Sequence, residues 1–545
     1  MKVLEKPNMK KRSRSENRSV PEEDKREIPK AHRDAVAHLV KKKESMLAGG
    51  GESRQAKQRA KGKKTARERI HFLADKGSFV ENQPYVSSRS DDFGMDKKKF
   101  SGDGVISGSV LIEGRQIWLT SQDFTVLGGS LGEQHAEKIA NAQMNALKTG
   151  KPFVQINDSG GARIQEGVMS LEGYGKIFRA NTLASGVIPQ ISLIMGPCAG
   201  GAAYSPALTD FVFMVDKTSQ MYITGPDVIR AVTGENVTGE ALGGAEAHNS
   251  KSGNAHFRCA SEDECLTTLK RLLSYLPSSN REAPPIVDCT DNPNRDTGEI
   301  LHILPDKANK PYDIRKVIDL VFDQESFLEV HKEFAASMVV GFARLAGRTV
   351  GVYGNQPIVF AGSLDKDSSD KAARFIRFCD AFGIPLVSLV DVPGYMPGTV
   401  QEYGGIIRHG AKLLYAVAEA TVPKIALVLR KAYGGAYIGM ASKALGYDRV
   451  LALPTAEIAV MGAAGAANII FRNDINAARD PDLIREIKIH EYQEKFMNPF
   501  AAASQGIVDD VIAPEAIRQE LVRSVEMMAG KMEDLPRKKH GNIPL

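Results

Sequence analysis

Two distant stretches of the chain have the same order of apolar and glycine positions. The apolar run Ile188–Met195 leads to the glycine pair Gly200–Gly201, after which a helical pattern begins. The apolar run that starts at Val422 leads in the same way to Gly434–Gly435. A short apolar run bounded by glycine is typical of a buried strand. Each stretch therefore predicts a strand, a tight turn and the start of a helix.

The likeness between these stretches extends upstream, to segments that begin at Pro152 and Pro385. The first segment reads PFVQINDSGGARIQEG and the second reads PLVSLVDVPGYMPGTV. The two copies lie about 234 positions apart, much more than the roughly 20 to 50 residues of a solenoid repeat. A unit of this size is about one domain. We therefore predict an internal duplication with one domain per copy.

Further periodic segments predict the elements around these turns. Alternating residues in Gly104–Val126 predict a β-hairpin centred on Glu113 and Gly114. A basic amphipathic helix that buries Ile70 and Leu73 is expected within Gly49–Glu81. We also expect helices at Glu133–Lys148, Asp313–Phe322 and Gly404–Val417, strands within Phe342–Val359, and a surface loop at Gly234–His256.

The segment Leu276–Pro311 separates the two copies. Its prolines and mixed polar residues place a domain boundary near residue 300. The predicted organisation is a basic extension over residues 1–45, an N-terminal domain over residues 46–300 and a C-terminal domain over residues 301–545.

The Gly-Gly turns suggest a particular chemistry. Glycine permits a positive φ and lets another group approach the backbone closely. The first amides of a helix have no carbonyl partner within it and carry partial positive charge. Such a turn can hold an anion or a developing oxyanion, although a lone Gly-Gly turn is more often only a tightly packed turn. Two turns at matching places in a duplicated chain favour the functional interpretation, while Pro206 can kink the first helix.

The composition is that of a soluble globular protein, with 42% hydrophobic and 25% charged residues among 545. Charge is uneven, because residues 1–70 hold 22 Lys and Arg against 10 Asp and Glu. A solvated, partly disordered extension explains residues 1–45. A nucleic-acid arm is disfavoured because no aromatic residue precedes Phe72. The basic residues from Arg54 to Arg69 have two interpretations, simple solvation or attraction of a phosphorylated ligand.

Several kinds of site and location are disfavoured. Five cysteines without a Cys-x-x-Cys pair argue against a zinc ribbon and suit a reducing compartment. His248 and His256 lack further residues that would complete a metal site. The uncharged stretch Ala180–Thr209 is long enough to span a bilayer, but prolines and glycines break it, so we expect buried core. With no apolar signal core at the N-terminus, we expect a cytoplasmic protein without metal, membrane insertion or nucleic acid.

Two other turns offer alternative interpretations. Gly128–Gly132 matches the nucleophile-elbow pattern, with Ser130 as the nucleophile of a serine hydrolase. That hydrolase would need an acid and a histidine and would leave the duplication unexplained. Asp158–Arg163 is a backbone-rich turn beside a cation, which suits either a phosphate or pantetheine amide or an ordinary strand-to-helix loop. The sequence has no Walker loop, dinucleotide fingerprint, HExxH pair or biotin-accepting Ala-Met-Lys-Met, so any cofactor must come from another chain.

Seven motifs together identify a family. They are GKKTARERI, DSGGARIQEG, GPCAGGAAYSPAL, MYITGPDVI, HNSKSGNAHF, LRKAYGGAYIGM and KKHGNIPL. In this order they resemble the carboxyltransferase β subunit of biotin-dependent acyl-CoA carboxylases, most of all propionyl-CoA carboxylase, over nearly everything after about residue 30. The resemblance implies an α/β fold of two tandem crotonase-like ββα superhelix domains and a ring of six chains. It also implies a biotin carboxylase and biotin carboxyl carrier α subunit as partner.

The resemblance also implies roles for the two turns. Gly200 and Gly201 would offer amides to the acyl-CoA thioester oxygen, and Gly435 and Ala436 to the ureido oxygen of biotin carried on another subunit. One oxyanion-hole donor can contribute about 3 to 4 kcal/mol to a transition state. The proton can pass to biotin, so no side-chain base is required. Further contacts are implied on the acyl-CoA side for Ala162, Arg163, Ala202, Tyr204 and Ile438, and on the biotin side for Gly434, Tyr437 and Gly462.

Two departures from the family pattern bear on the substrate and the direction of transfer. Ile438 stands where propionyl-selective relatives commonly have Asp, which favours apolar acyl groups, propionyl and also butyryl. One methylene in an apolar pocket discriminates by only about 1 to 3 kcal/mol. Gly462–Gly465 reads GAAG, where relatives usually carry a bulkier or charged residue. Because isoleucine is similar to what methylmalonyl-CoA decarboxylase subunits carry, the reverse transfer stays open as the alternative.

Overall fold

The computed structural model describes residues 28–545, which form two units, residues 28–47 and residues 48–545. Residues 1–27 of the predicted extension lie outside the described residues. The rest of that extension lies in α1 (Lys30–Ala48), a helix in which no residue is buried. Because Ala, Leu and Lys have high helix propensity, this part of the extension is an exposed helix. The predicted solvated, partly disordered extension over residues 1–45 stays a prediction.

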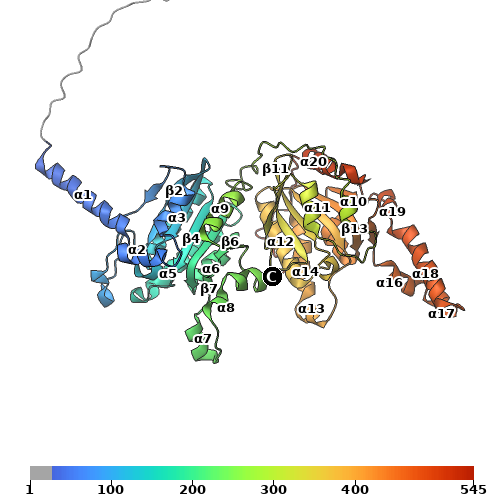
Figure 1. Ribbon diagram of the computed structural model, residues 1–545, viewed down its shortest axis with the longest axis horizontal. Helices are drawn as coiled ribbons and strands as arrows, with labels where there is room; N and C mark the ends of the chain where they lie inside the picture. Colours follow the sequence, from blue (N-terminus) through green and yellow to red (C-terminus); the bar gives the residue numbers. More distant parts are fainter. Residues whose placement is uncertain (1–27) are drawn as a thin grey trace, which may run out of the picture. The chain divides into compact units, whose positions relative to one another are not determined.

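The second unit contains two sheets, each with its own helices (Figure 1). We call residues 48–276 the first half, residues 277–299 the linker and residues 300–545 the second half. The helices of the first half are α2 (Glu52–Arg59), α3 (Ala66–Leu73), α4 (Glu133–Thr149), α5 (Val168–Ala184), α6 (Gly201–Ala207), α7 (Pro226–Thr233), α8 (Gly239–Gly243) and α9 (Glu262–Leu273). Its strands are β1 (Val80–Asn82), β2 (Val105–Ile112), β3 (Arg115–Gln122), β4 (Phe153–Ser159), β5 (Gln190–Ala199), β6 (Phe211–Val215), β7 (Gln220–Tyr222) and β8 (Phe257–Cys259).

The second half repeats these elements and adds helices at its C-terminal side. Its strands are β9 (Leu328–Val330), β10 (Met338–Leu345), β11 (Arg348–Asn355), β12 (Leu386–Val392), β13 (Lys424–Tyr433), β14 (Arg449–Ala452), β15 (Glu457–Ala459) and β16 (Asp510–Val511). Its helices are α10 (Ile300–Ile303), α11 (Ile314–Val321), α12 (Lys366–Ala381), α13 (Thr399–Tyr403), α14 (Ile406–Glu419), α15 (Gly434–Ala441), α16 (Ala463–Ile470), α17 (Arg472–Ala477), α18 (Pro481–Tyr492), α19 (Pro499–Ser504) and α20 (Ile517–Met527).

The two sheets have matching topologies. The first has the order β1-β2-β3-β4-β5-β6-β8 with β7 beside β5, and the second has β9-β10-β11-β12-β13-β14-β16 with β15 beside β13. In each, an antiparallel hairpin is followed by parallel strands. The elements β4, β5 and α6 recur as β12, β13 and α15, 233 or 234 positions later. The predicted α/β fold of two duplicated domains is therefore confirmed.

Most predicted elements are present, and two segments differ from expectation. The hairpin turns at Glu113 and Gly114, which both have positive φ angles of 50° and 77°. The prediction of a single basic helix was wrong, because the chain turns at Gly62 (φ 74°) between α2 and α3. Thr65 is the N-cap of α3 and forms a capping box with Glu68. The predicted loop at 234–256 contains α8 and a π-helical turn at Ala247–Lys251, and its last residue, His256, is buried.

The uncharged stretch Ala180–Thr209 is divided between the end of α5, β5 and α6, and β5 is almost entirely buried. Among residues 28–545, no helix has the length and apolar character needed to cross a membrane. The β5 part of this segment is core, as the sequence predicts, whereas Leu183, Tyr204 and Leu208 are exposed.

A shared aromatic core joins the two halves. Phe211 of β6 lies 4.6 Å from Phe378 of α12 and 6.0 Å from Phe342 of β10, measured between ring centroids. All three rings are buried in one apolar cluster that also includes residues from both sheets. The predicted division near residue 300 stays a prediction, since the halves are packed as one unit.

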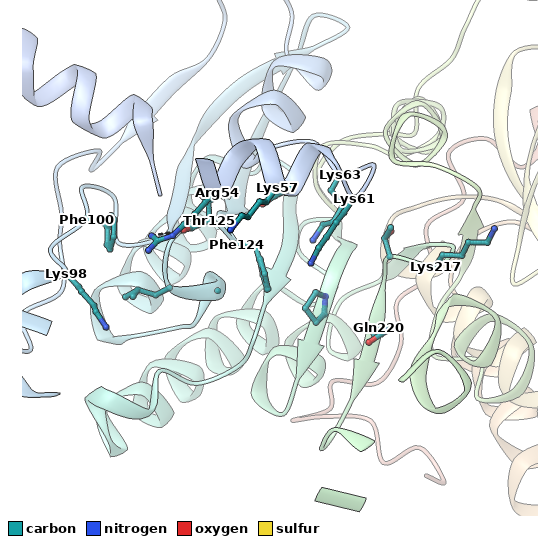
Figure 2. Close-up of a pocket in the computed structure, with 15 residues that line it drawn as sticks. Arg54, Lys57, Lys61, Lys63, Lys98, Phe100, Phe124, Thr125, Lys217 and Gln220 are labelled. Atoms are coloured by element: carbon teal, nitrogen blue, oxygen red, sulfur yellow. Dashed lines mark hydrogen bonds between the residues drawn. The ribbon is translucent and has the colours of Figure 1, made fainter. Parts of the chain in front are cut away.

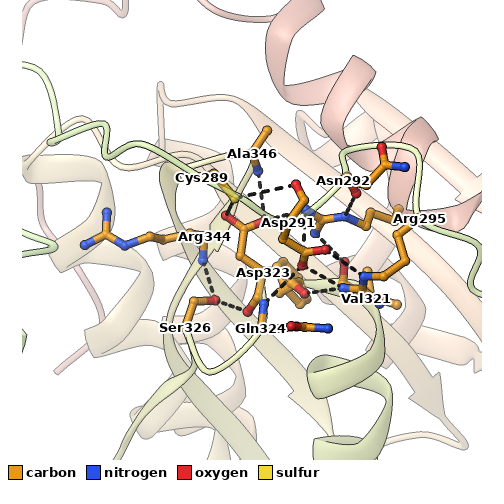
Figure 3. A network of polar contacts seen from close by, with 12 residues as sticks. Cys289, Asp291, Asn292, Arg295, Val321, Asp323, Gln324, Ser326, Arg344 and Ala346 are labelled. Carbon is orange, nitrogen blue, oxygen red and sulfur yellow. Dashed lines mark hydrogen bonds and ion pairs between the residues drawn. The ribbon is translucent and has the colours of Figure 1, made fainter.

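A buried polar network holds the linker on the second half (Figure 3). Arg518 of α20 donates to Asp323 Oδ1 at 2.6 Å and to the linker carbonyl of Asn292 at 2.9 Å. Asp323 also accepts from the amides of Ala346 and Gly347, in the turn between β10 and β11. Arg518 is fully buried, so its charge depends on these partners.

Replacing Arg518 with methionine will leave Asp323 buried without its charged partner. Loss of one partner of a buried ion pair destabilises by about 3 to 5 kcal/mol. We expect Arg518→Met to lower the thermal unfolding midpoint clearly in differential scanning calorimetry. The matched control is Arg523→Met on the same helix, where a 60% exposed arginine pairs with Glu520 and the effect should be below about 1 kcal/mol. Equal midpoints for both variants would contradict this role of Arg518.

Candidate functional site

The two Gly-Gly turns share a positive φ at their first glycine. Gly200 has φ 60° and Gly434 has φ 59°, and each lies at the junction of a buried strand and a short helix, β5 to α6 and β13 to α15. A left-handed φ at this junction is a conformation that glycine adopts without strain. The amides that follow are those of the first helical turn, which lack carbonyl partners within the helix.

The surroundings of the two turns differ. A β-carbon at Gly201 would lie 2.7 Å from the ring of Tyr174, a buried residue of α5. At Gly435, the nearest atom to such a β-carbon is in the ring of Tyr395, at 3.8 Å. The Tyr174 ring therefore leaves no room for a side chain at Gly201, whereas a small side chain would fit at Gly435.

A buried carboxylate lies beside the first turn. Asp158, at the end of β4, is fully buried and pairs with Lys63 at 2.7 Å and Arg69 at 3.0 Å. Arg69 also pairs with Glu262 at 2.6 Å. Burial lowers the pKa of Lys63, an effect that the neighbouring Asp158 opposes. A β-carbon at Gly196 would lie only 1.9 Å from Asp158 Oδ1, so this position of β5 must be glycine.

The second half has the same carboxylate with different cations. Asp391, at the end of β12, is fully buried and pairs with Arg430 at 2.8 Å and Lys431 at 3.0 Å. Both cations come from β13, at the positions that Gly196 and Pro197 occupy in β5. The first half therefore takes its cations from an earlier segment of the chain, and the second half takes them from the neighbouring strand.

In the Asp158–Arg163 turn, the side chain of Arg163 is not available to a ligand. The Arg163 side chain is 1% exposed and pairs with Asp103 at 2.7 Å and Glu166 at 2.8 Å. Its guanidinium is thus occupied by internal carboxylates and does not face a phosphate. Ala162 forms a bridge with Leu131, which ties this turn to the start of α4.

Ser130 has no histidine among its hydrogen-bond partners in the described chain. Its hydroxyl donates to the carbonyl of Leu127 at 2.8 Å, and Arg163 Nε approaches it at 3.5 Å. The nearby His135 bonds instead to Gln122 and to the carbonyl of Asp103. This arrangement does not provide the base that a serine hydrolase needs.

A basic cavity of about 890 Å³ lies next to the first turn (Figure 2). Its rim includes Pro197, three residues before Gly200, and Gln220 of β7. No acidic residue lines it. Its basic and aromatic lining consists of Arg54, Lys57, Lys61, Lys63, Lys98, Lys217, Phe100 and Phe124.

Most of the cations in this cavity are not neutralised. Within residues 28–545, no ion pair is formed by Lys57, Lys61, Lys98 or Lys217. The sequence pointed to the basic residues between Arg54 and Arg69, of which four line the cavity. It gave no signal for Lys98 and Lys217, because only the fold brings these isolated lysines to the same place.

The other predicted site residues lie on or near the two turns. Ala202 and Ala436 are buried in the first turn of their helices, whereas Tyr204 of α6 and Ile438 of α15 are 51% and 43% exposed. Tyr437 follows Ala436 on α15, and Gly462 is the N-cap of α16. Among residues 28–545, no group of three His, Cys, Asp or Glu side chains could hold a metal ion.

Exposed apolar side chains are found around both turns. In the first half these include Ile164, Val168 and Leu171 before or on α5, together with Tyr204 and Leu208. In the second half they include Tyr403, Ile407, Ile438, Val460 and Met461. Large exposed apolar patches mark interaction sites, so these side chains are candidates for contact with another molecule.

Comparisons with known proteins agree with one another. The model of the family described as "Carboxyl transferase domain" matches residues 57–543. The chain is 56% identical over 512 residues to a propionyl-CoA carboxylase carboxyltransferase subunit of Haloferax mediterranei, covering 94% of this chain and 99% of that one. It is 55% identical over 510 residues to the methylmalonyl-CoA decarboxylase subunit alpha of Propionigenium modestum, with the same coverage. The crystal structure of transcarboxylase 12S with methylmalonyl-coenzyme A and methylmalonic acid bound matches with a TM-score of 0.93 and 52% identity, over 96% of this chain and 100% of that one.

Replacing Gly196 with alanine will insert a methyl group into the Asp158 ion-pair cluster. The nearest contact, 1.9 Å to Asp158 Oδ1, cannot be relieved without separating the carboxylate from Lys63. We expect a loss of about 1 to 3 kcal/mol in the free energy of unfolding, measured as a lower midpoint in chemical denaturation. Gly175→Ala on α5 is the control, because a β-carbon there meets no atom within 4 Å. A Gly196→Ala protein as stable as wild type would refute the packing argument.

Proposed function

The chain belongs to the carboxyl transferase domain family, and on this basis we propose that it moves a carboxyl group from carboxybiotin to the α-carbon of a short-chain acyl-CoA. Propionyl-CoA is the proposed acceptor and methylmalonyl-CoA the product. The enzyme activity of the chain is carboxyl transfer, as in its relatives. The chain would act as one subunit of a larger ligase complex.

The basic cavity is the observation that carries the acyl-CoA assignment. Coenzyme A has a diphosphate and a 3′-phosphate, and four unpaired lysines with no acidic neighbour are suited to bind them. The cavity reaches Pro197, just before the first turn. A CoA bound there would have its thioester end near Gly200 and Gly201.

The first turn would stabilise the charge that develops on the acyl group. Loss of the α-proton from a thioester places negative charge on the carbonyl oxygen, where the amide of Gly201 can donate a hydrogen bond. The amide of Gly200, which the sequence also suggested as a donor, already donates to the carbonyl of Tyr222 at 3.0 Å. The Tyr174 ring packs directly against Gly201. This contact would hold the turn in place as the charge forms.

The second turn fits the ureido group of biotin. Gly434 supplies the left-handed turn, Gly435 and Ala436 supply the amides, and the nearest atom to a β-carbon at Gly435 lies 3.8 Å away, which leaves an open cradle. Tyr437 and Gly462 are further proposed contacts on this side. When bound, carboxybiotin would supply the carboxyl group and take up the proton. Residues of the chain would hold the ureido oxygen and exclude water.

We also propose the assembly and partners of the chain. The exposed apolar side chains around both turns are suited to contact a second copy of the chain, so that one copy's first turn faces the other copy's second turn. The matching solved structure is described as a hexamer assembly, and six copies are our proposal here. The donor subunit would be a biotin carboxylase with a biotin carboxyl carrier. A cytoplasmic location is proposed as well.

The direction of transfer has a second candidate. The Propionigenium modestum relative, named a decarboxylase subunit, is nearly as similar to this chain as the carboxylase subunit of Haloferax mediterranei. Transfer from methylmalonyl-CoA onto biotin would use the same two turns. Acyl selectivity would depend on Ile438, an apolar and half-exposed residue beside the second turn. Its discrimination between propionyl and butyryl groups should be only about 1 to 3 kcal/mol.

A substrate panel tests the proposed function. The chain, assembled with its biotin carboxylase partner, is incubated with ATP, labelled bicarbonate and acetyl-, propionyl- or butyryl-CoA. We expect labelled methylmalonyl-CoA as the main product and a slower reaction with butyryl-CoA. Gly201→Val should abolish the product because its side chain would collide with Tyr174, while Gly175→Ala should keep it. No labelled product from any acyl-CoA would refute carboxylation, and product from methylmalonyl-CoA and free biotin alone would favour the reverse transfer.

The cavity predicts a specific change in substrate affinity. Lys61→Gln and Lys217→Gln each remove one unpaired charge, and a charged hydrogen bond contributes about 1.5 to 3 kcal/mol. We expect KM for propionyl-CoA to rise about tenfold in each variant, with kcat little changed. Propionyl-pantetheine, which lacks the nucleotide, should react equally well with wild type and both variants. Lys251→Gln, an exposed lysine outside the cavity, should behave as wild type, and an unchanged KM in the cavity variants would contradict this binding mode.

A further inference from the structure

A group of neutral polar side chains is buried beneath α6, the helix that begins at the first turn. The group, here called the α6 network, has members on α4, β4, α5, β5 and α6, and every member is 5% exposed or less. Buried polar groups in this number are uncommon unless they are mutually hydrogen-bonded. The members are Gln143, Gln155, Asn181, Gln190, Ser192, Ser205 and Thr209.

Ser205 connects α6 to the network. Its hydroxyl donates to Asn181 Oδ1 of α5 at 3.0 Å and accepts from Gln155 Nε2 of β4 at 3.1 Å. Asn181 in turn donates to Gln190 Oε1 at 3.1 Å, and Gln190 Nε2 donates back to the carbonyl of Asn181 at 3.0 Å. One side chain of α6 is thus held by both the sheet and the neighbouring helix.

A second branch of the network holds the C-terminal end of α6. Gln155 Nε2 also donates to Ser192 at 2.8 Å, and Ser192 bonds to the Thr209 hydroxyl at 2.9 Å. Thr209 donates in turn to the carbonyl of Pro206, the proline inside α6, at 2.7 Å. Arg374 of α12, in the second half, donates to the carbonyl of Thr209 at 2.8 Å. Both halves of the chain therefore fix the end of this helix.

The second half builds the same fold without this network. At the positions that match Gln143, Asn181, Ser192 and Ser205, it has Ile376, Val417, Ala426 and Gly439. Its helix α15 packs in an apolar cluster and is held by the Tyr447 hydroxyl, which donates to the carbonyl of Gly439 at 3.1 Å and also bonds to the Tyr353 hydroxyl. The architecture therefore does not require the amide and hydroxyl side chains of the α6 network, and the fold alone does not explain them.

The network supplies directional contacts that apolar packing lacks. Helix α6 is only seven residues long and includes Pro206, which has no amide hydrogen to donate. Its own hydrogen bonds therefore fix its position weakly. Hydrogen bonds have preferred lengths and angles, so a buried network of mutual hydrogen bonds can determine position more narrowly than apolar contacts do. Within residues 28–545, Gln143 Oε1 is the one side-chain atom of this network without a partner.

We propose that the α6 network is a positioning device for the first turn. Asn181 and Ser205 are its positioning residues, since they hold α6, and with it Gly200 and Gly201, at one depth and orientation above β4 and β5. They touch neither the acyl group nor the carboxyl donor. This inference rests on the proposed function for its effect on catalysis, whereas its effect on the mobility of α6 is independent of that function.

The test replaces the network's contacts at α6 with apolar ones, as in the second half. In the variant Asn181→Leu/Ser205→Ala, Gln155 keeps its bond to Ser192 and Gln190 keeps its bond from Gln143, so few buried groups lose every partner. We expect the unfolding midpoint and the assembly to change little, and kcat for propionyl-CoA to fall at least tenfold with KM within about threefold. The single variant Ser205→Cys keeps a weak donor at nearly the same volume. It should therefore have a higher kcat than the double variant.

Hydrogen–deuterium exchange of the assembled protein provides the second readout. We expect the amides of residues 199–208 to exchange at least tenfold faster in the double variant, with those of residues 433–442 unchanged. Ser524→Ala on α20 is the control, because this buried serine donates only to the carbonyl of Glu520 within its own helix. It should leave kcat and both exchange rates as in wild type.

The possible outcomes separate the two proposals. Unchanged exchange at residues 199–208 in the double variant would overturn the positioning role, and so would an unchanged kcat. A fall in kcat that is matched by an equal fall in stability, with no recovery in Ser205→Cys, would also overturn it in favour of a purely structural role. If wild type carboxylates no acyl-CoA, the proposed function fails, and the exchange experiment alone decides the inference.

Discussion

The structure of each half depends on one buried carboxylate at the end of its central parallel strand. A carboxylate with no solvent contact is unfavourable unless cations and hydrogen bonds surround it. Asp158 meets this requirement with Lys63 and Arg69. Because both cations come from the segment of α2 and α3, the ion pairs hold that segment against the sheet. The same segment carries Arg54, Lys57 and Lys61, so the cavity wall is placed by the interaction that neutralises Asp158.

The duplication shows how one requirement can be met in two ways. In the second half, Arg430 and Lys431 neutralise Asp391 from the adjacent strand, and both also donate to carbonyls of the Lys307–Lys310 segment. Both cations are therefore occupied by partners within the protein. In the first half, glycine and proline occupy the matching positions of β5, and Asp158 and Lys63 fill the space at Gly196. Lys63 and Pro197 then line the basic cavity next to the first turn.

The sequence predicts well the structural features that depend on residues close together in the chain. The duplication, the hairpin at Glu113 and Gly114, and both Gly-Gly turns are encoded by residues close together in the chain, where glycine and apolar spacing are direct signals. The cluster around Asp158 was not predicted, because Lys63 and Arg69 precede it by 95 and 89 positions. Arg163 shows the same limit: its position in a backbone-rich turn suggested a ligand contact, whereas Asp103 and Glu166 occupy its guanidinium. The split of the basic helix depended on a capping box at Thr65 whose effect outweighed the surrounding periodicity.

The aromatic contacts between the halves restrict how the molecule can move. Phe211, Phe342 and Phe378 are buried against one another, and exposing one such side chain to water costs about 1.5 to 3 kcal/mol. A hinge-bending motion that separated the two sheets would expose all three. Reactants must therefore enter and leave without interdomain opening, by way of the edges of the molecule.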